Sequence, residues 1–109
     1  MANDRVYVGT DLKVKVELAC EGFSMDDDDY DVIVKCGDTS IKYTTNPTAA
    51  SDKGFVDIDG DYYIYIPTDD MKGVVSLVAT LYVPDEDYVE GDGIRREVVK
   101  QDLCQVKKT

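Results

Sequence analysis

The stretch LKVKVELAC, residues 12–20, alternates apolar and polar side chains at every second position. Leu12, Val14 and Val16 point to one face of an extended chain, and Lys13 and Lys15 point to the other. This period of two is typical of a β-strand that has one face in a core and one face in water. The stretch therefore predicts a half-buried strand over residues 12–20.

The same period recurs along most of the chain. Further strands are predicted over residues 6–8, 30–36, 40–44, 55–58, 62–66, 74–83 and 94–104. Residues 74–83 form the most apolar segment, which indicates a central strand. In the last strand the alternation is interrupted at Val98-Val99, and this predicts a bulge or an edge position there.

Two connections carry recognisable turn signals. Asp59-Gly60 indicates a two-residue hairpin turn, because both central positions of such a turn need a positive φ. Residues 68–72 are predicted to form one helical turn, which Thr68 or Asp69 caps and Gly73 ends in the left-handed conformation. Together these elements predict an all-β fold, an immunoglobulin-like β-sandwich of seven or eight antiparallel strands with one short helical turn, as a single domain over residues 1–109.

Composition excludes several classes of function. The chain has 23 Asp and Glu against 12 Lys and Arg, a net charge of −11, which disfavours binding to nucleic acids and anionic membranes. It has no histidine, so the usual general base and the commonest transition-metal ligand are missing, and we expect neither an enzyme nor a cofactor. The first five residues lack the apolar core of a signal peptide, and we expect synthesis in the cytoplasm with reduced thiols.

More than half of the carboxylates fall in three segments, residues 26–31, 57–61 and 85–92. In immunoglobulin-like order the loops 21–29, 59–60 and 84–93 lie at one end of the sandwich, and residues 68–72 lie at the other. Two interpretations stay open, namely solvated carboxylates that confer solubility, or a polar patch for cations or a basic partner. For the second, we predict that Asp26, Asp28, Arg95 and Arg96 contact the partner.

A bound cation is an alternative use of the same loops. Carboxylate oxygens suit calcium better than zinc, and Asp27, Asp29, Asp85 and Asp87 are the candidate ligands. Plain solvated carboxylates are the competing interpretation, and we assign no metal site firmly.

The chain has three cysteines, an odd number. Cys36 and Cys104 are predicted at the same end of the sandwich, the only pair in reach of a disulfide. Buried apolar thiols are the favoured interpretation.

The strands 62–66 and 74–83 carry apolar side chains on both faces. Tyr63, Tyr65, Val78 and Tyr82 oppose the predicted core positions, which is unusual for a face that meets only water. Since contiguous exposed apolar side chains mark contact surfaces, we predict a partner-binding strip formed by these four residues.

Three stretches carry a family resemblance: GTDLKVKVELACEGFSMDDDDYDVIVK at 9–35, DGDYYIYIPTDDMKG at 59–73 and ATLYVPDEDYVEGDGIRREV at 79–98. In their order of strands and acidic turns they resemble small immunoglobulin-like virion proteins of tailed phages that infect Bacteroides-type gut bacteria, such as the crAss-like phages. The chain departs from antibody-type domains, since it has no tryptophan and no matching cysteine pair.

The resemblance implies an auxiliary (decoration) protein on the capsid surface, which acts without catalysis by binding other virion proteins. The implied partners are the major capsid protein or a head fibre, with further copies of the chain in an oligomer or array, and the implied location is a virion assembled in the host bacterial cytoplasm. A tail, baseplate or head-fibre adaptor is the alternative within that family. Outside it, the alternatives are a carbohydrate-binding module and a calcium-stabilised adhesion module.

Overall fold

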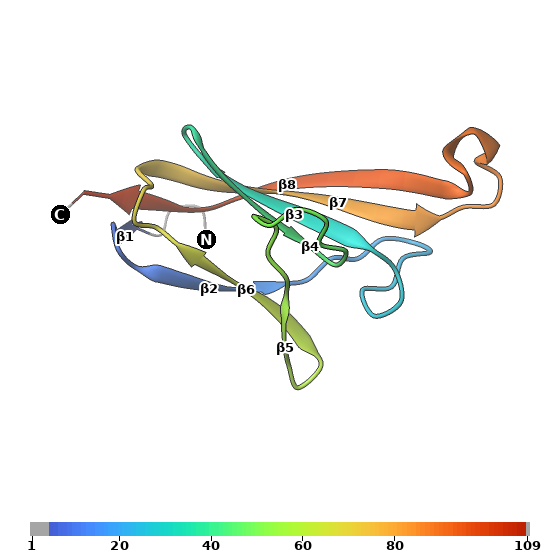
Figure 1. Cartoon of the computed structure of the whole chain (residues 1–109), viewed down its shortest axis with the longest axis horizontal. Coiled ribbons are helices and arrows are strands. Elements are labelled where there is room, and N and C mark those ends of the chain that lie inside the picture. The colour runs from blue at the N-terminus through green and yellow to red at the C-terminus, as the bar shows by residue number, and fades with distance from the viewer. Residues whose placement is uncertain (1–4, 109) are drawn as a thin grey trace.

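The computed structural model describes residues 5–108 (Figure 1). Residues 1–4, part of the segment considered for a signal sequence, lie outside the described residues. The strands are β1 (Arg5–Tyr7), β2 (Asp11–Val16), β3 (Tyr30–Cys36), β4 (Thr39–Thr44), β5 (Val56–Ile58), β6 (Asp61–Pro67), β7 (Gly73–Pro84) and β8 (Ile94–Lys107). A short 3-10 helix, Val89–Gly91, lies between β7 and β8.

The strands form two sheets, which confirms the predicted all-β class. One sheet has the order β1-β8-β7-β3-β4, and the other has the order β2-β6-β5. All pairs are antiparallel except β1 with β8, which is parallel. No helix within residues 5–108 has the length and apolar character needed to cross a membrane.

Both sheets contribute to one apolar core. Val32 and Val34 of β3 and Ile64 and Ile66 of β6 are fully buried, at 0% exposure. Their polar or half-buried neighbours alternate with them along each strand, so the period of two read from the sequence directs one face of each sheet inward. Tyr30 is among the largest fully buried side chains, and its ring packs against Phe23 and Phe55.

Several strand predictions agree with the structure. β3 occupies residues 30–36 as predicted, and β7 is central because it pairs with β3 on one side and β8 on the other. Asp59 has φ 53° and Gly60 has φ 88°, so the predicted positive-φ turn joins β5 to β6.

β2 is shorter than predicted and ends at Val16. The alternation continues, but the Leu18 N–H donates to the Met25 Sδ at 3.3 Å and not to a neighbouring strand. The alternating side-chain pattern thus continues beyond Val16, where the backbone of β2 stops pairing with β6. Residues 17–29 therefore form one long connection to β3 (Figure 1).

The interruption at Val98-Val99 marks an edge and not a bulge. Pairing with β7 continues through both residues, as Thr80 opposite Val98 and Ala79 opposite Val99. The bulge lies at Leu103, where Cys104 and Asp102 oppose consecutive residues of β7. β1 pairs only with residues 105–107, so residues 94–104 have no described strand on their other side.

Residues 68–71 form a single turn that is not helical, so the helix predicted over residues 68–72 is wrong while a turn at this place is present. The Met71 N–H donates to the Thr68 carbonyl at 3.1 Å, which closes the turn, and Gly73, with φ 104°, is already the first residue of β7. Met71 is 2% exposed. Its burial in the core stabilises this turn, which has no further helical hydrogen bonds.

Thr68 connects the turn between β1 and β2 to the end of β6. Its side chain is fully buried, and its Oγ1 accepts from the Gly9 N–H at 3.1 Å and donates to the Thr10 carbonyl at 2.7 Å. Thr68→Val keeps the shape but leaves both backbone groups without this partner, so we expect it to lower the free energy of unfolding by about 1–3 kcal/mol.

Urea denaturation measures this loss, and Thr68→Ser, which keeps the hydroxyl, is the matched control. If Thr68→Val unfolded at the wild-type urea concentration, the hydroxyl would have no role in joining these segments.

No disulfide joins the three cysteines. Cys36 and Cys104 lie on β3 and β8, and β7 lies between these strands. Two strand spacings amount to about 9.6 Å, which exceeds the Cα separation of about 7 Å that a disulfide spans. The Cys36 Sγ instead donates to the Lys72 carbonyl at 3.3 Å.

Candidate functional site

Tyr63 and Tyr65 lie on the outer face of the three-stranded sheet. They stand opposite Lys15 and Lys13 of β2 in the strand register. The Lys13 Nζ lies 4.8 Å from the centroid of the Tyr63 ring and 5.9 Å from that of Tyr65, within the range of a cation–π contact. Tyr65 is 44% exposed, so this face presents aromatic surface together with ammonium groups.

Val78 and Tyr82 lie on the outer face of the five-stranded sheet. The Tyr82 hydroxyl donates to Asp31 Oδ2 at 2.8 Å, and this hydrogen bond raises the pKa of Tyr82. Val78 stands between Ile33 of β3 and Lys100 of β8. The predicted strip of four residues is therefore wrong as one surface, because β6 and β7 belong to different sheets whose outer faces point away from a shared core.

Asp26 connects the acidic loop 21–29 to the second sheet. Its Oδ1 accepts from the Tyr62 hydroxyl at 2.7 Å. That hydrogen bond raises the pKa of Tyr62, and the charges of Asp57 and Asp27 add to the effect. The loop therefore lies next to the start of β6, as predicted, and the hydrogen bond between Asp26 and Tyr62 joins the two.

The next acidic residues hold the loop itself. Asp28 Oδ2 accepts from the Ser24 N–H at 2.8 Å, and Asp29 Oδ1 accepts from the Thr45 hydroxyl at 3.0 Å. The Asp29 carbonyl accepts from the Tyr82 N–H at 3.1 Å, which continues the hydrogen bonding of β3 with β7 beyond Tyr30. Asp28 and Asp29 are therefore committed to local structure.

Loops 21–29 and 85–93 lie at one end of the molecule, and the connection 67–73 lies at the other, while the β5–β6 turn projects to the side (Figure 1). The predicted clustering of the three acidic loops at one end is therefore only partly correct. Loop 21–29 lies next to both β6 and the end of β7, but the β5–β6 turn and the β7–β8 loop point in different directions.

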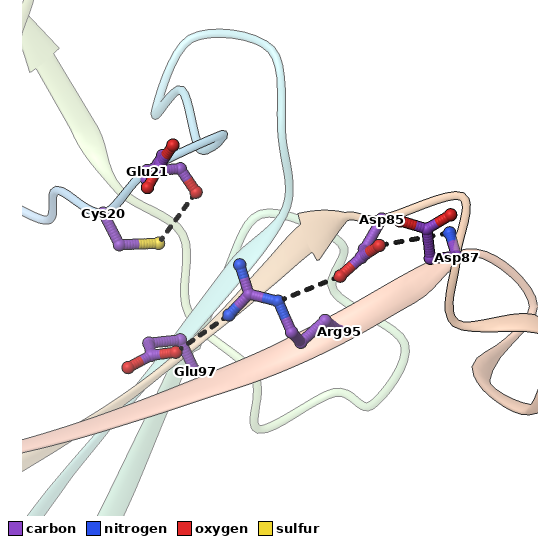
Figure 2. Close-up of polar contacts among 6 residues, drawn as sticks. All are labelled: Cys20, Glu21, Asp85, Asp87, Arg95 and Glu97. Atoms are coloured by element: carbon purple, nitrogen blue, oxygen red, sulfur yellow. Dashed lines mark hydrogen bonds and ion pairs between the residues drawn. The ribbon is translucent and has the colours of Figure 1, made fainter.

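Arg95 neutralises part of the β7–β8 loop. Its Nε lies 3.3 Å from Asp85 Oδ2, and its Nη1 lies 3.0 Å from Glu97 Oε2. Figure 2 shows the guanidinium between these two carboxylates, with Asp85 also accepting from the Asp87 N–H at 3.1 Å. Arg96 is exposed on the opposite face of β8, across from Tyr82.

The calcium candidates gain no support from this arrangement. Asp27 and Asp29 belong to one loop and Asp85 and Asp87 to another, and Arg95 already lies against Asp85. Within residues 5–108, no group of three or more Asp, Glu, Cys or His side chains is placed to hold a metal ion.

Sequence reasoning missed the concentration of exposed apolar side chains on the β7–β8 hairpin. Val89 is 79% exposed and Val98 is 62% exposed, and Tyr88, Ile94 and Val99 are each more than 40% exposed. The hairpin extends beyond the other strands at the end of the molecule that bears its loop (Figure 1). The interrupted alternation at Val98-Val99 was a sequence signal for exposed apolar residues on β8. The apolar residues of the loop gave no such signal, because they stand among many carboxylates.

Comparison with protein-family models, with curated protein sequences and with solved structures gave no match.

Proposed function

We propose that this chain is an immunoglobulin-like β-sandwich that serves as a structural protein of a phage particle, on the capsid surface, and acts by binding other virion proteins without catalysis. The strand order supports the fold assignment. With β2, β6 and β5 as strands B, E and D, the other sheet has the order A′, G, F, C and C′, including the parallel pair of the first and last strands. The resemblance, which covers the chain from about Gly9 to Cys104, supports the phage setting.

The observation that carries the binding role is the projecting β7–β8 hairpin with its exposed apolar residues. A side chain such as Val89, at 79% exposure on a loop tip, loses unfavourable contact with water when a partner covers it. The carboxylates around it are partly engaged with Arg95 and with backbone N–H groups, which leaves the apolar tip rimmed by polar side chains. An apolar centre within a polar rim is the usual composition of a protein interface.

Two measurements test this function. Mass spectrometry of purified particles is expected to find the chain at a fixed ratio to the major capsid protein. Particles stripped of the chain are expected to rebind it, and Val89→Asp is expected to weaken rebinding by about tenfold or more, because it buries a charge in the contact.

Val56→Asp is the matched control, since Val56 is 41% exposed on β5, away from the hairpin, and is expected to rebind like wild type. Absence of the chain from particles, or a genomic position among polysaccharide-utilisation genes, would overturn the virion role. Glycan binding or calcium-dependent melting of the isolated chain would point to an adhesion module instead.

A further inference from the structure

The longest free strand edge among the described residues belongs to β8. β7 pairs with it on one side along its whole length, while β1 covers only residues 105–107 on the other. Residues 94–104 therefore present one side of an extended backbone without a strand neighbour, and Val98 and Val99 are 62% and 44% exposed there. An edge of this length is a template for pairing with another strand.

The charge of this edge favours a second copy of the chain. Residues 94–104 carry Arg95, Arg96 and Lys100 against Glu97 and Asp102, whereas the whole chain has a net charge of −11. The repulsion that the net charge causes between two copies is therefore weakest where they approach along β8.

We propose that β8 pairs antiparallel with β8 of a second copy, across a two-fold axis at Val99, to form one continuous sheet. A two-fold axis perpendicular to the joined sheet leaves the outer faces of the two copies on the same side of it. Residues that stand directly opposite each other in an antiparallel pair point to the same side, so the axis must lie where a residue faces its own copy and not between two residues. With the axis at Val99, Arg96 stands opposite Asp102 of the second copy, and symmetry repeats this ion pair.

Both residues of that ion pair are on the outer face. Arg96 is opposite Tyr82 and Asp102 is opposite Ser76 in the register with β7, and both of those residues point away from the core. Asp102 already accepts from the Ser76 hydroxyl at 2.8 Å, which orients its carboxylate on this face. The remaining opposed pairs are Val98 with Lys100 and Glu97 with Gln101, so no like charges face each other directly.

Neighbouring registers are less favourable. An axis at Val98 opposes Arg96 with Lys100, and an axis at Glu97 or at Lys100 opposes that residue with its own copy, all of which place like charges together. An axis beyond Lys100 brings the bulge at Leu103 into the paired stretch. Charge and bulge together select Val99, and the paired stretch runs from Arg96 to Asp102.

The core-facing side of the edge adds apolar contact. Val99 borders a cavity of about 290 Å³ that Leu18, Leu77 and Leu81 also line, between β8 and the connection after β2. The axis places a second Val99 beside the first at the margin of this cavity, which removes both side chains from water.

Analytical ultracentrifugation of the isolated chain over a range of concentrations tests the proposal. We expect a reversible dimer, and we expect Arg96→Asp and Asp102→Arg each to raise its dissociation constant by about tenfold or more, since each change acts twice across the axis. The double variant exchanges the two charges and is expected to return the dissociation constant to within about threefold of wild type.

Lys42→Asp is the matched control, because it reverses an exposed charge on β4, the opposite edge of the same sheet, and is expected to leave the dimer unchanged. Far-UV circular dichroism and thermal melting of each variant establish that it is folded. A chain that stays monomeric, single variants that dimerise like wild type, or a double variant that fails to recover would each overturn the proposal. The test uses no phage particle, so its result is separate from that of the proposed function.

Discussion

Ile64→Ala is expected to lower the free energy of unfolding by about 3–4 kcal/mol, a large share of the stability of a domain of this size. Ile64 is fully buried on β6, the middle strand of the three-stranded sheet, and points into the core that both sheets share. The change removes methylene and methyl groups from contact with their neighbours and leaves a cavity, and both effects destabilise the folded state. Urea denaturation followed by circular dichroism measures the change.

Ile94→Ala is the matched control, because it deletes the same atoms from a side chain that is 43% exposed at the start of β8. Its expected cost is below about 1 kcal/mol. If the two variants lost the same stability, the core would not be centred where the two sheets meet.

Stability is expected to fall steeply above pH 10, by about 3 kcal/mol at pH 11, through the buried phenols of Tyr30 and Tyr43. Burial raises the pKa of each from 10.0 to about 12. Between these values the unfolded tyrosines have lost their protons while the folded ones keep them. The unfolded state then binds fewer protons, so the free energy of unfolding decreases as pH rises from about 10 to about 12.

Urea denaturation at intervals between pH 9 and pH 12 measures this slope, and Tyr43→Phe isolates the contribution of one ring. The variant keeps the buried ring but lacks the hydroxyl that donates to the Tyr65 carbonyl at 2.7 Å, so it starts less stable. Its decline above pH 10 is expected to be shallower, since the contribution of Tyr43 is lost while Tyr30 and the phenols of Tyr62 and Tyr82, whose pKa values are also raised, still titrate. Equal slopes for both proteins would exclude Tyr43 as a source of the alkaline loss.

Local pattern predicted most of the strands but not where each one ends. The alternation of residues 30–36 matches β3, and the φ values of Asp59 and Gly60 match the turn that their residue types favour. β2 ends before its pattern does, because a strand needs a partner backbone and the Leu18 N–H meets a sulfur atom instead. Such a contact depends on residues that the pattern of one strand does not describe.

The candidate surfaces were predicted less well than the strands. Pattern alone identified Tyr63, Tyr65, Val78 and Tyr82 as outward-facing, but whether two outward faces coincide depends on which sheet each strand joins. The contact of Asp26 with Tyr62 likewise depends on the path of a long loop. Periodicity indicates the direction of a side chain relative to its own strand. It does not indicate which residues of another sheet or loop lie beside that side chain.

The parallel pairing of β1 with the end of β8 has a consequence for the order of folding. About 100 residues separate Arg5–Tyr7 from the residues that they pair with, so closing this loop costs more chain entropy than forming the β5–β6 or β7–β8 hairpin. During synthesis β1 emerges about 100 residues before its partner, and this corner of the sheet is expected to assemble after the hairpins and to open before them. Each such opening would expose β8 from Ile94 to its very end.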